Sequence, residues 1–267
     1  MGSQVTFSFE VLELNLRATL GVFSRAHPAG EVRSLRGLEL ICAGVRFSTF
    51  NAVLLTDPAS DEDELLERLQ APRQYFVAHG LPWSVWLCEE WLAPRLKRRA
   101  DAIFEAAGLR LLTRMPGMVA LRLNPPARRL PSLAFRKVED EATRRAFEQI
   151  MSATFDVPPA IARQIYGAEA TWRDGLTGWV GCLRDFPVTS AATRVAAGVV
   201  GVYAVGTLPG FRGQGCAEAV MRHALQEAQA ASGIETSVLQ STSVGLRLYE
   251  KLGYRPVTGY RVYVASR

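Results

Sequence analysis

The chain has 267 residues, 48% hydrophobic and 21% charged, with a formal net charge of +5 at pH 7. This is the composition of an ordinary globular protein, long enough for one large or two medium domains. No apolar run approaches the roughly 18 residues that a membrane span needs, which excludes a membrane-spanning protein.

The N-terminal segment does not resemble a signal peptide, because Glu10 and Glu13 interrupt its apolar stretch and a basic leader is missing. The four cysteines are far apart, with no CxxC pair and no nearby histidine. The sequence therefore predicts neither a disulfide framework nor a metal site, and a reducing cytoplasm is the expected location.

Positive charge is spread along the chain, with clusters only at 95–99 and 128–129. A nucleic-acid-binding protein would concentrate basic residues with interleaved aromatic residues, so that class is not expected. A mild positive balance also suits an anionic small ligand.

The first half shows a strand, helix, strand, helix order that ends in two strands. The expected elements are a strand at 51–56, a helix beginning at 61–70, a strand at 83–88, a helix at 92–108 and strands at 109–115 and 117–123. Residues 123–133 follow, and their three prolines and polar flanks predict a linker between domains 1–130 and 131–267.

The second half begins with a strand and helix and then repeats the order of the first half. The expected elements are a strand at 133–138, a helix at 139–155, a short helix after Pro158 and Pro159, strands at 179–185, 187–196 and 199–207, a helix at 214–231, a strand at 237–241, a helix at 244–253 and two terminal strands. The sequence thus predicts an α/β protein with a mixed sheet in each half.

The two halves also match in sequence at one place. FEAAGLR (104–110) and YEKLGYR (249–255) both leave a helix through a glycine and enter a strand, 145 residues apart. We interpret this match as an internal duplication.

The most informative stretch is VYAVGTLPGFRGQGCAEAV, residues 202–220. A strand through Thr207 is broken by Pro209, and Arg212-Gly213-Gln214-Gly215-Cys216-Ala217 then turns into a long helix. The glycines let the backbone approach a bulky ligand, while the helix N-terminus and Arg212 add positive charge. Such a loop suits a pyrophosphate, although a plain strand-to-helix turn with a solvated arginine has the same local sequence.

This loop resembles the signature of the GNAT superfamily of N-acetyltransferases, Gln/Arg-x-x-Gly-x-Gly/Ala, through Arg212, Gly215 and Ala217. LRLYEKLGYR (246–255) is similar to the segment that the family carries downstream, so the resemblance covers roughly 133–267. It implies acetyl-CoA as cofactor, with the pyrophosphate on the amides of 212–217 and the pantetheine along Val205, Gly206 and Thr207. The nucleotide-binding motifs GxGxxG and GxxxxGK[ST] are both absent.

The resemblance also assigns roles to two positions at or after the strand expected at 237–241. Tyr249 occupies the family's usual general-acid position, where a phenol with a pKa near 10 can protonate the leaving thiolate. Ser241, Thr242 or Ser243 stands where many relatives carry an asparagine near the cofactor, and Ser241 is the expected contact.

The general base of the family has no counterpart at its usual position, because Tyr203 stands where many relatives have a glutamate. Deprotonating a lysine-like amine at pH 7 costs about 4.6 kcal/mol, against about 1.4 kcal/mol for an α-amine. A low-pKa acceptor amine is therefore the easier substrate. Asp156, Glu169 and Asp174 are candidates for a base acting through water, but each is better explained as a solvated acid, and His223 as a structural residue.

The first half lacks the same chemistry. Its acidic segment 57–64 would repel a pyrophosphate, Ser60 with Asp63 suggests a helix cap, and Phe104 replaces the tyrosine. This half resembles the degenerate repeat of tandem GNAT proteins. Its Asn51, Trp83, Trp86 and Met118 could line an acceptor cleft, but core packing explains them better.

We therefore expect two GNAT-like domains in tandem, the first degenerate. The second would transfer an acetyl group from acetyl-CoA to a small-molecule or peptide amine, with neither nucleic acid nor membrane as partner. The alternative is a non-catalytic acyl-CoA-binding or sensing protein. The acceptor, the acyl chain preference and the oligomeric state do not follow from the sequence.

Overall fold

The computed structural model describes residues 8–265, so the first residues of the N-terminal segment discussed above lie outside it. The first half contributes α1 (Phe9–Arg25), β1 (Glu31–Leu35), β2 (Leu38–Cys42), β3 (Asn51–Leu55), α2 (Glu62–Ala78), β4 (Ser84–Cys88), α3 (Pro94–Ala106) and β5 (Leu109–Ala120). The second half contributes β6 (Ala134–Lys137), α4 (Glu141–Phe155), α5 (Pro159–Tyr166), α6 (Ala170–Arg173), β7 (Leu176–Leu183), β8 (Phe186–Ala196), β9 (Val199–Thr207), α7 (Cys216–Ser232), β10 (Ser237–Gln240), α8 (Leu246–Lys251) and β11 (Arg255–Ala265). The α/β prediction is confirmed.

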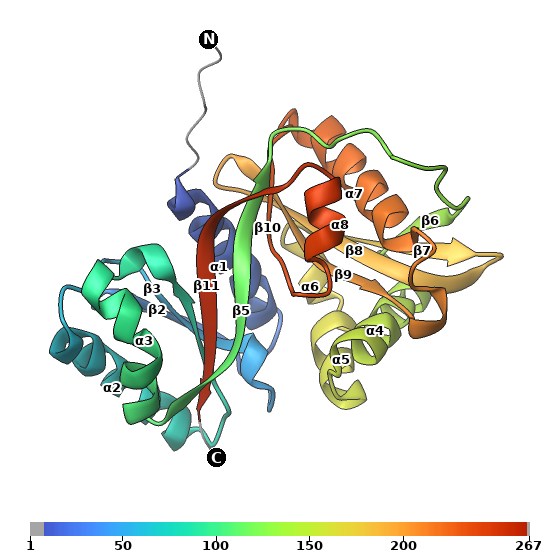
Figure 1. Ribbon diagram of the computed structural model, residues 1–267. Helices are drawn as coiled ribbons and strands as arrows, with labels where there is room; N and C mark the ends of the chain where they lie inside the picture. The colour runs from blue at the N-terminus through green and yellow to red at the C-terminus, as the bar shows by residue number, and fades with distance from the viewer. Residues whose placement is uncertain (1–7, 266–267) are drawn as a thin grey trace, which may run out of the picture.

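All eleven strands form one mixed sheet in the order β1-β2-β3-β4-β11-β5-β10-β9-β8-β7-β6. The two halves exchange their last strands: β11 of the second half lies between β4 and β5, and β5 of the first half lies against β10. Figure 1 shows β5 and β11 side by side at the centre of the molecule. The sheet therefore continues without a break from one half to the other.

Each half contains one pair of parallel strands, β3 with β4 and β9 with β10. Both pairs are short. β9 pairs with β10 only at Val200–Ser237 and Gly201–Val238, although β9 itself continues to Thr207. The strands thus part after Gly201, which leaves the end of β9 without a strand partner on the β10 side.

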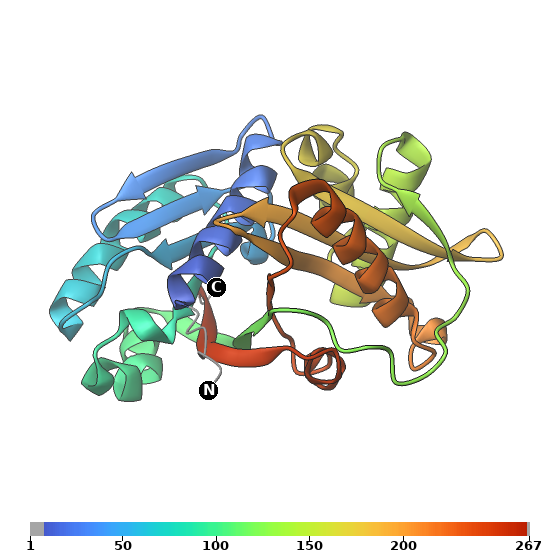
Figure 2. The same ribbon diagram turned by 90° about the horizontal axis from the view of Figure 1, so that it is seen from above.

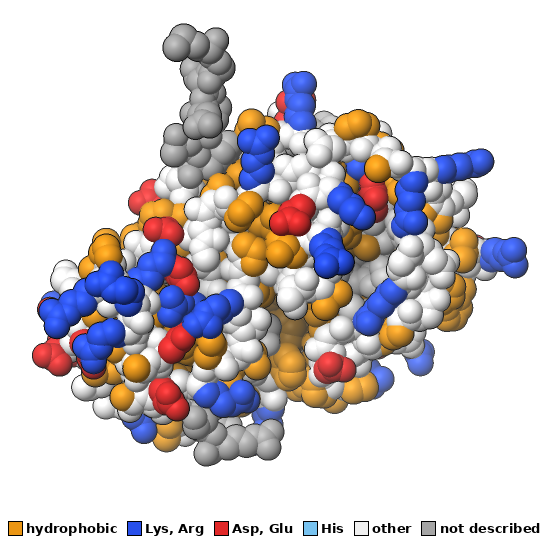
Figure 3. All heavy atoms as spheres, in the orientation of Figure 1, with side chains coloured by type: hydrophobic (Ala, Val, Ile, Leu, Met, Phe, Trp, Pro, Cys, Tyr) orange, Lys and Arg blue, Asp and Glu red, His pale blue; other side chains and the backbone are white. Residues whose placement is uncertain are grey.

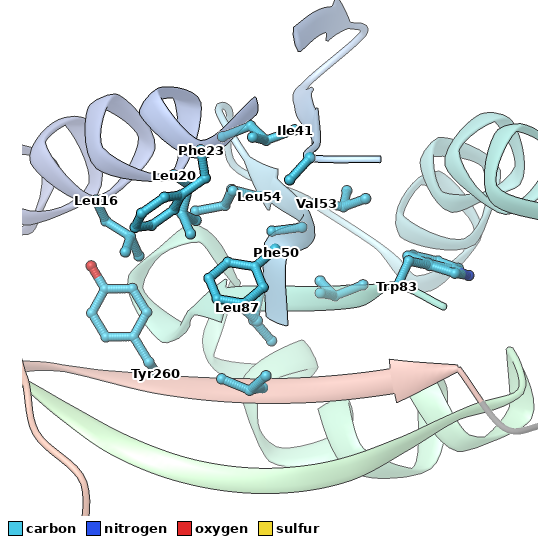
Figure 4. Packing of buried hydrophobic residues seen from close by; sticks show 14 of the residues in the cluster. Leu16, Leu20, Phe23, Ile41, Phe50, Val53, Leu54, Trp83, Leu87 and Tyr260 are labelled. Carbon is cyan, nitrogen blue, oxygen red and sulfur yellow. The ribbon is translucent and has the colours of Figure 1, made fainter. Parts of the chain in front are cut away.

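Helices cover both faces of the sheet, as the view in Figure 2 shows. α1 and α4 pack on one face, and α3, α7 and α8 on the other. α1 lies over the middle of the sheet, where Leu16, Leu20 and Phe23 contact Phe50 and other buried side chains of the first half (Figure 4). On its other side α1 contacts β8 and β9 of the second half, so this helix joins the two halves.

The expected pairs of terminal strands are wrong in both halves, because each half ends in one long strand, β5 or β11. Pro116 was expected to interrupt β5. The register with β10 ends at Gly117, so the missing N–H of Pro116 lies just past this ladder and costs no strand–strand bond. The Pro116 carbonyl accepts a hydrogen bond from the Ser241 amide at 2.9 Å instead.

Candidate active site

The N-terminus of α7 has a row of free backbone donors. Its N-cap is Gly215, which has no side chain to satisfy the first turn. Within the described chain, no N–H from Gly213 to Glu218 donates to a protein acceptor. The other long helix of the second half, α4, differs, since Asp140 caps it by accepting a hydrogen bond from the Thr143 amide at 2.8 Å. The unpaired amides and the helix dipole make this turn able to hold an anion.

The conformation of the loop explains its two glycines. Gly213 and Gly215 have φ of +75° and +89°, in the left-handed region that other residues avoid. A Cβ at Gly213 would meet no atom within 4 Å, so the loop faces open space there. At Gly215 it would come within 3.3–3.5 Å of the linker residues Arg128, Leu130 and Pro131. Figure 1 shows this linker arching past α7 to reach β6.

Two arginines stand beside the free amides. Arg212 is exposed and its Nε donates to the Thr207 carbonyl at 3.2 Å. Arg128 of the linker donates to the Gly213 carbonyl at 3.0 Å. Across residues 8–265, neither guanidinium has a carboxylate within 4 Å. Both charges are therefore free to pair with a bound anion.

The predicted pantetheine positions Val205, Gly206 and Thr207 all lie on the unpaired end of β9. A β-bulge precedes them, where Ala204 has φ of +52° and the register with β8 shifts. The Thr207 hydroxyl shares a hydrogen bond with Thr189 at 2.9 Å, which fixes its side chain. This segment can pair with an extended ligand as a strand would.

Tyr249 lies on α8, on the face of the sheet that α7 covers. Its ring packs on Gly245 and against Tyr254, with 5.9 Å between the two ring centroids. Burial raises the pKa of Tyr249 to about 12, so the phenol keeps its proton at neutral pH. Its hydroxyl donates to no protein group among the described residues, which leaves it available to a ligand.

Ser241, the predicted cofactor contact, is fully buried, and its hydroxyl donates to the Thr242 carbonyl at 2.8 Å. Its amide ties the end of β10 to β5 by donating to the Pro116 carbonyl. Thr242 and Ser243, the alternatives named from the sequence, are exposed at the same bend.

Two of the three acidic residues suggested from the sequence form ion pairs. Asp174 pairs with Arg25 at 2.7 Å and Glu169 pairs with Arg173, while Asp156 ends α4 in a left-handed conformation. His223 is a structural residue, since its ring lies between Phe135 and Trp179 and burial lowers its pKa.

Tyr203, which stands where the family would have a base, makes a hydrogen bond across the two halves. Its hydroxyl donates to Asn15 Oδ1 of α1 at 2.6 Å. The Asn15 amide nitrogen donates in turn to two carbonyls of β8 and one of β9, at 3.0–3.3 Å. The contact does not follow from the expected elements, because no helix was predicted over Phe9–Arg25.

The corresponding loop of the first half is closed. Asp61 caps α2 by accepting from the Glu64 amide at 2.8 Å, and Glu64 accepts from the Ser60 amide at 3.0 Å. Ala59 then bonds to the Trp91 carbonyl at 2.9 Å and bridges to Leu92, which joins the segments after β3 and β4. The protein's own groups thus fill the place where the second half is open.

The other first-half residues belong to the core. Phe104 is fully buried and stacks on Tyr263 with 4.1 Å between ring centroids. Asn51, Trp83 and Met118 are buried too, as core packing predicted, and Trp86 is half-buried.

The basic cluster at 95–99 lies on α3, and two of its four basic residues form ion pairs. Arg99 contacts Glu62 at 2.8 Å, and Lys97 contacts Glu89 and Glu90 at 3.2 and 3.3 Å. Figure 3 shows acidic side chains among the basic ones over this part of the surface. Over residues 8–265 no helix is long and apolar enough to cross a bilayer, and no three His, Cys, Asp or Glu residues gather as a metal site.

The comparisons with known proteins agree with this geometry. Residues 162–256 match the family model of the acetyltransferase (GNAT) domain. The fold is similar to that of a GCN5-related N-acetyltransferase from Kribbella flavida, with a TM-score of 0.73 and 19% identity, covering 98% of this chain and 97% of that one. Among curated proteins, no sequence matches the chain.

Two further solved structures share the fold. One is a conserved protein of unknown function from Staphylococcus epidermidis, with a TM-score of 0.63 and 10% identity, covering 91% of this chain and 96% of that one. The other is a GCN5-related N-acetyltransferase from Sphaerobacter thermophilus, with a TM-score of 0.57 and 15% identity, covering 85% and 76%. At these identities the likeness concerns the fold.

Proposed function

We propose that this chain, whose residues 162–256 carry an acetyltransferase domain of the GNAT family, transfers an acetyl group from acetyl-CoA to an amine. The observation that carries the proposal is the row of free amides from Gly213 to Glu218, beside the unpaired end of β9. An anion and an extended chain attached to it would meet both features at once. Acetyl-CoA has this form, a pyrophosphate joined to a pantetheine arm.

The residues divide the work as follows. The amides at the start of α7, with Arg212, would bind the pyrophosphate. The end of β9 from Val205 to Thr207 would hold the pantetheine by backbone hydrogen bonds. Acetyl-CoA supplies the acetyl group as a thioester, and Tyr249 would donate a proton to the sulfur when the C–S bond breaks.

Replacing Arg212 with alanine tests the assignment of this loop. A charge-assisted contact is worth about 1.5–3 kcal/mol, so Arg212→Ala should weaken CoA binding by roughly ten- to a hundredfold. The fold should survive, since the side chain is exposed and bonds only to Thr207. Isothermal titration calorimetry with CoA measures the change, and Arg247→Ala, an exposed arginine on α8, is the control. Unchanged CoA affinity in Arg212→Ala would contradict the proposal.

The number of sites is a second test. The Asp61 cap, the acidic first turn of α2 and the Ala59–Leu92 bridge make the matching turn of the first half unfavourable for an anion. We expect one CoA per chain in the same titration. Two equivalent sites per chain would overturn this assignment.

We also propose that residues 1–130 and 131–267 are two GNAT-like units in tandem, the first of them degenerate. The proposal is supported by the parallel pairs β3–β4 and β9–β10, each connected by a helix and followed by a helix and one long strand. The first half then serves as a structural partner. Figure 3 shows the surface hollowed between the two halves, with hydrophobic side chains in the hollow, and this is a suitable approach for the acceptor.

A non-catalytic acyl-CoA-binding or sensing protein is the alternative, favoured by the absence of a glutamate at Tyr203. Measuring the release of CoA thiol from acetyl-CoA in the presence of amines distinguishes the acetyltransferase from the non-catalytic protein. Steady turnover with any amine excludes the sensing protein, whereas tight CoA binding without turnover across a broad amine panel would support it.

A further inference from the structure

A group of buried polar side chains lies where α1 crosses the sheet. Glu13 of α1 is fully buried, and its Oε2 accepts a hydrogen bond from Trp91 Nε1 at 3.1 Å. Its other oxygen, Oε1, is buried without a partner among the described residues. The Tyr260 hydroxyl and the Gln240 amide nitrogen are also buried and make no hydrogen bond among the described residues. The Tyr260 hydroxyl lies beside both Glu13 and Gln240.

The register of the sheet places this group at the open end of β9. Gln240 is two residues past the last β9–β10 pair, Gly201–Val238, so it lies level with Tyr203 across the opening. Gly117 separates Gln240 from β11, and a Cβ there would come within 2.7 Å of both Tyr260 and Thr258. The absence of a side chain at Gly117 lets the Tyr260 ring lie over β5. Figure 4 shows its hydroxyl pointing towards α1.

The two faces of the opening therefore carry different chemistry. Tyr249 belongs to the face that α7 and α8 cover, whereas Glu13, Tyr260 and Tyr203 belong to the face of α1. An acyl group held between β9 and β10 would have a proton donor on one side and a carboxylate on the other. This is the arrangement that acyl transfer to an amine requires, because the amine loses a proton and the leaving sulfur gains one.

The carboxylate is costly for folding. An unpaired buried carboxylate loses its hydration, and burial raises the pKa of Glu13 to about 7. The hydrogen bond from Trp91, the neighbouring Tyr260 hydroxyl and the charge of Arg17 act in the opposite direction. The other titratable groups that face Glu13 are Tyr203 of β9 and Cys88 of β4, and burial raises the pKa of both. Glu13 is thus poised to exchange a proton near neutral pH.

We propose that Glu13 is the proton acceptor of the reaction and replaces the base that Tyr203 does not provide, with the Tyr260 hydroxyl as the relay. This inference rests on the proposed acetyltransferase function. The protonated amine passes a proton to the Tyr260 oxygen while Tyr260 passes its own proton to Glu13. The neutral amine then forms the C–N bond, and its nitrogen loses a second proton to solvent as the C–S bond breaks. Tyr249 protonates the sulfur and recovers a proton from solvent, and Glu13 releases its proton to solvent, so one net proton leaves per turnover.

The first measurement is of Glu13 itself. In protein labelled with ¹³C at the glutamate carboxyls, the resonance that Glu13→Gln removes should titrate near pH 7. Tyr260→Phe should move this titration to higher pH, because the neighbouring Tyr260 hydroxyl lowers the pKa of Glu13. A Glu13 resonance that does not titrate between pH 5 and about 9 would overturn the proposal, whether or not an acceptor is known.

The second measurement is the pH dependence of kcat/KM, with acetyl-CoA and the amine that the panel identifies. In the wild type, kcat/KM should rise with an apparent pKa near 7, because the base must be ionised. Glu13→Gln should lower kcat/KM by about 10²–10⁴ and remove this limb, leaving the rate to follow the ionisation of the amine. Tyr260→Phe should lower kcat/KM by at least about tenfold. Glu10→Gln removes an exposed carboxyl on the same helix and is the matched control. It should change neither the value of kcat/KM nor its pH dependence.

The stability of Glu13→Gln at two pH values tests whether Glu13 ionises in the folded protein. The folded-state pKa is above that of the unfolded chain, 4.5, so ionisation removes stability as pH rises from there to about 7. Glu13→Gln should therefore melt at a higher temperature than the wild type at pH 8, with a smaller difference at pH 5. A variant that is less stable at pH 8, or that keeps the wild-type rate and pH profile, overturns the proposal.

Measuring CoA binding distinguishes a failure of the proposed function from a failure of the role assigned to Glu13. Calorimetry should give the same CoA affinity for Glu13→Gln and wild type. If the wild type binds no CoA, the proposed function itself is wrong. If it binds CoA and acetylates an amine with no change in Glu13→Gln, only the role of Glu13 is wrong.

Discussion

Residues 131–267, expressed without the first half, should fail to form a cooperatively folded domain. Among residues 8–265, β11 pairs only with strands of the first half, in ten register pairs with β5 and five with β4. Tyr260, Val262 and Tyr263 of β11 are at most 3% exposed and would lose most of the residues that bury them. β10 would also lose β5 and become an edge strand. Circular dichroism melting and size-exclusion chromatography measure the result.

A cut in the linker separates the covalent connection from the strand exchange. A protease site placed at 125–127 of the full chain leaves β5 and β11 in place when it is cleaved. The two fragments should then elute together and melt near the temperature of the intact protein, because the exchanged strands hold them. Two fragments that separate and stay folded would show that β11 can pair within its own half, and would contradict the importance of the exchange.

The sequence predicted the elements of the second half well, because each has a local cause. The helix before Gly233 has an apolar face, and the strands are bounded by glycine, proline or a tight turn. The partners of the strands could not be predicted in the same way. The apolar pattern of β11 satisfies β4 and β5 of the first half as well as it would satisfy β10, and only the assembled sheet decides between them.

The candidate site was predicted only where the backbone carries the function. A left-handed turn before a helix leaves the first amides of the helix free, and glycines mark such a turn in the sequence. The role of Gly213, Gly215 and Arg212 could therefore be predicted from the local sequence. Glu13 was missed, although a signal was present. On a helix it falls in the apolar stripe of Phe9, Leu12, Leu16 and Leu20, where a carboxylate would be buried. Its neighbours Tyr260 and Gln240 come from strands more than 200 residues later, and no local pattern connects them.

Tyr249→Phe should lower kcat by about 10²–10⁴, or roughly 3–5 kcal/mol in the barrier, with an amine acceptor. The hydroxyl has no protein partner among residues 8–265, so its removal leaves no buried group unsatisfied. The ring can keep its packing on Gly245 and Tyr254, and the melting temperature and the CoA affinity should barely change. A loss confined to kcat would show that the hydroxyl acts when the thiolate leaves.

The leaving thiol provides the control for this assignment. A phenol whose pKa is about 12 is a weak acid, so its proton helps most when the departing sulfur is strongly basic. The defect of Tyr249→Phe should therefore shrink when the donor is a thioester with a more acidic thiol. Tyr254→Phe removes a second buried phenol from the same cluster, and this hydroxyl lies 2.7 Å from Ser237 and faces no ligand. That variant should lose stability and keep its kcat. If Tyr249→Phe instead turns over within a few fold of the wild type with every donor, Tyr249 only packs its ring, and the sulfur must take its proton from solvent.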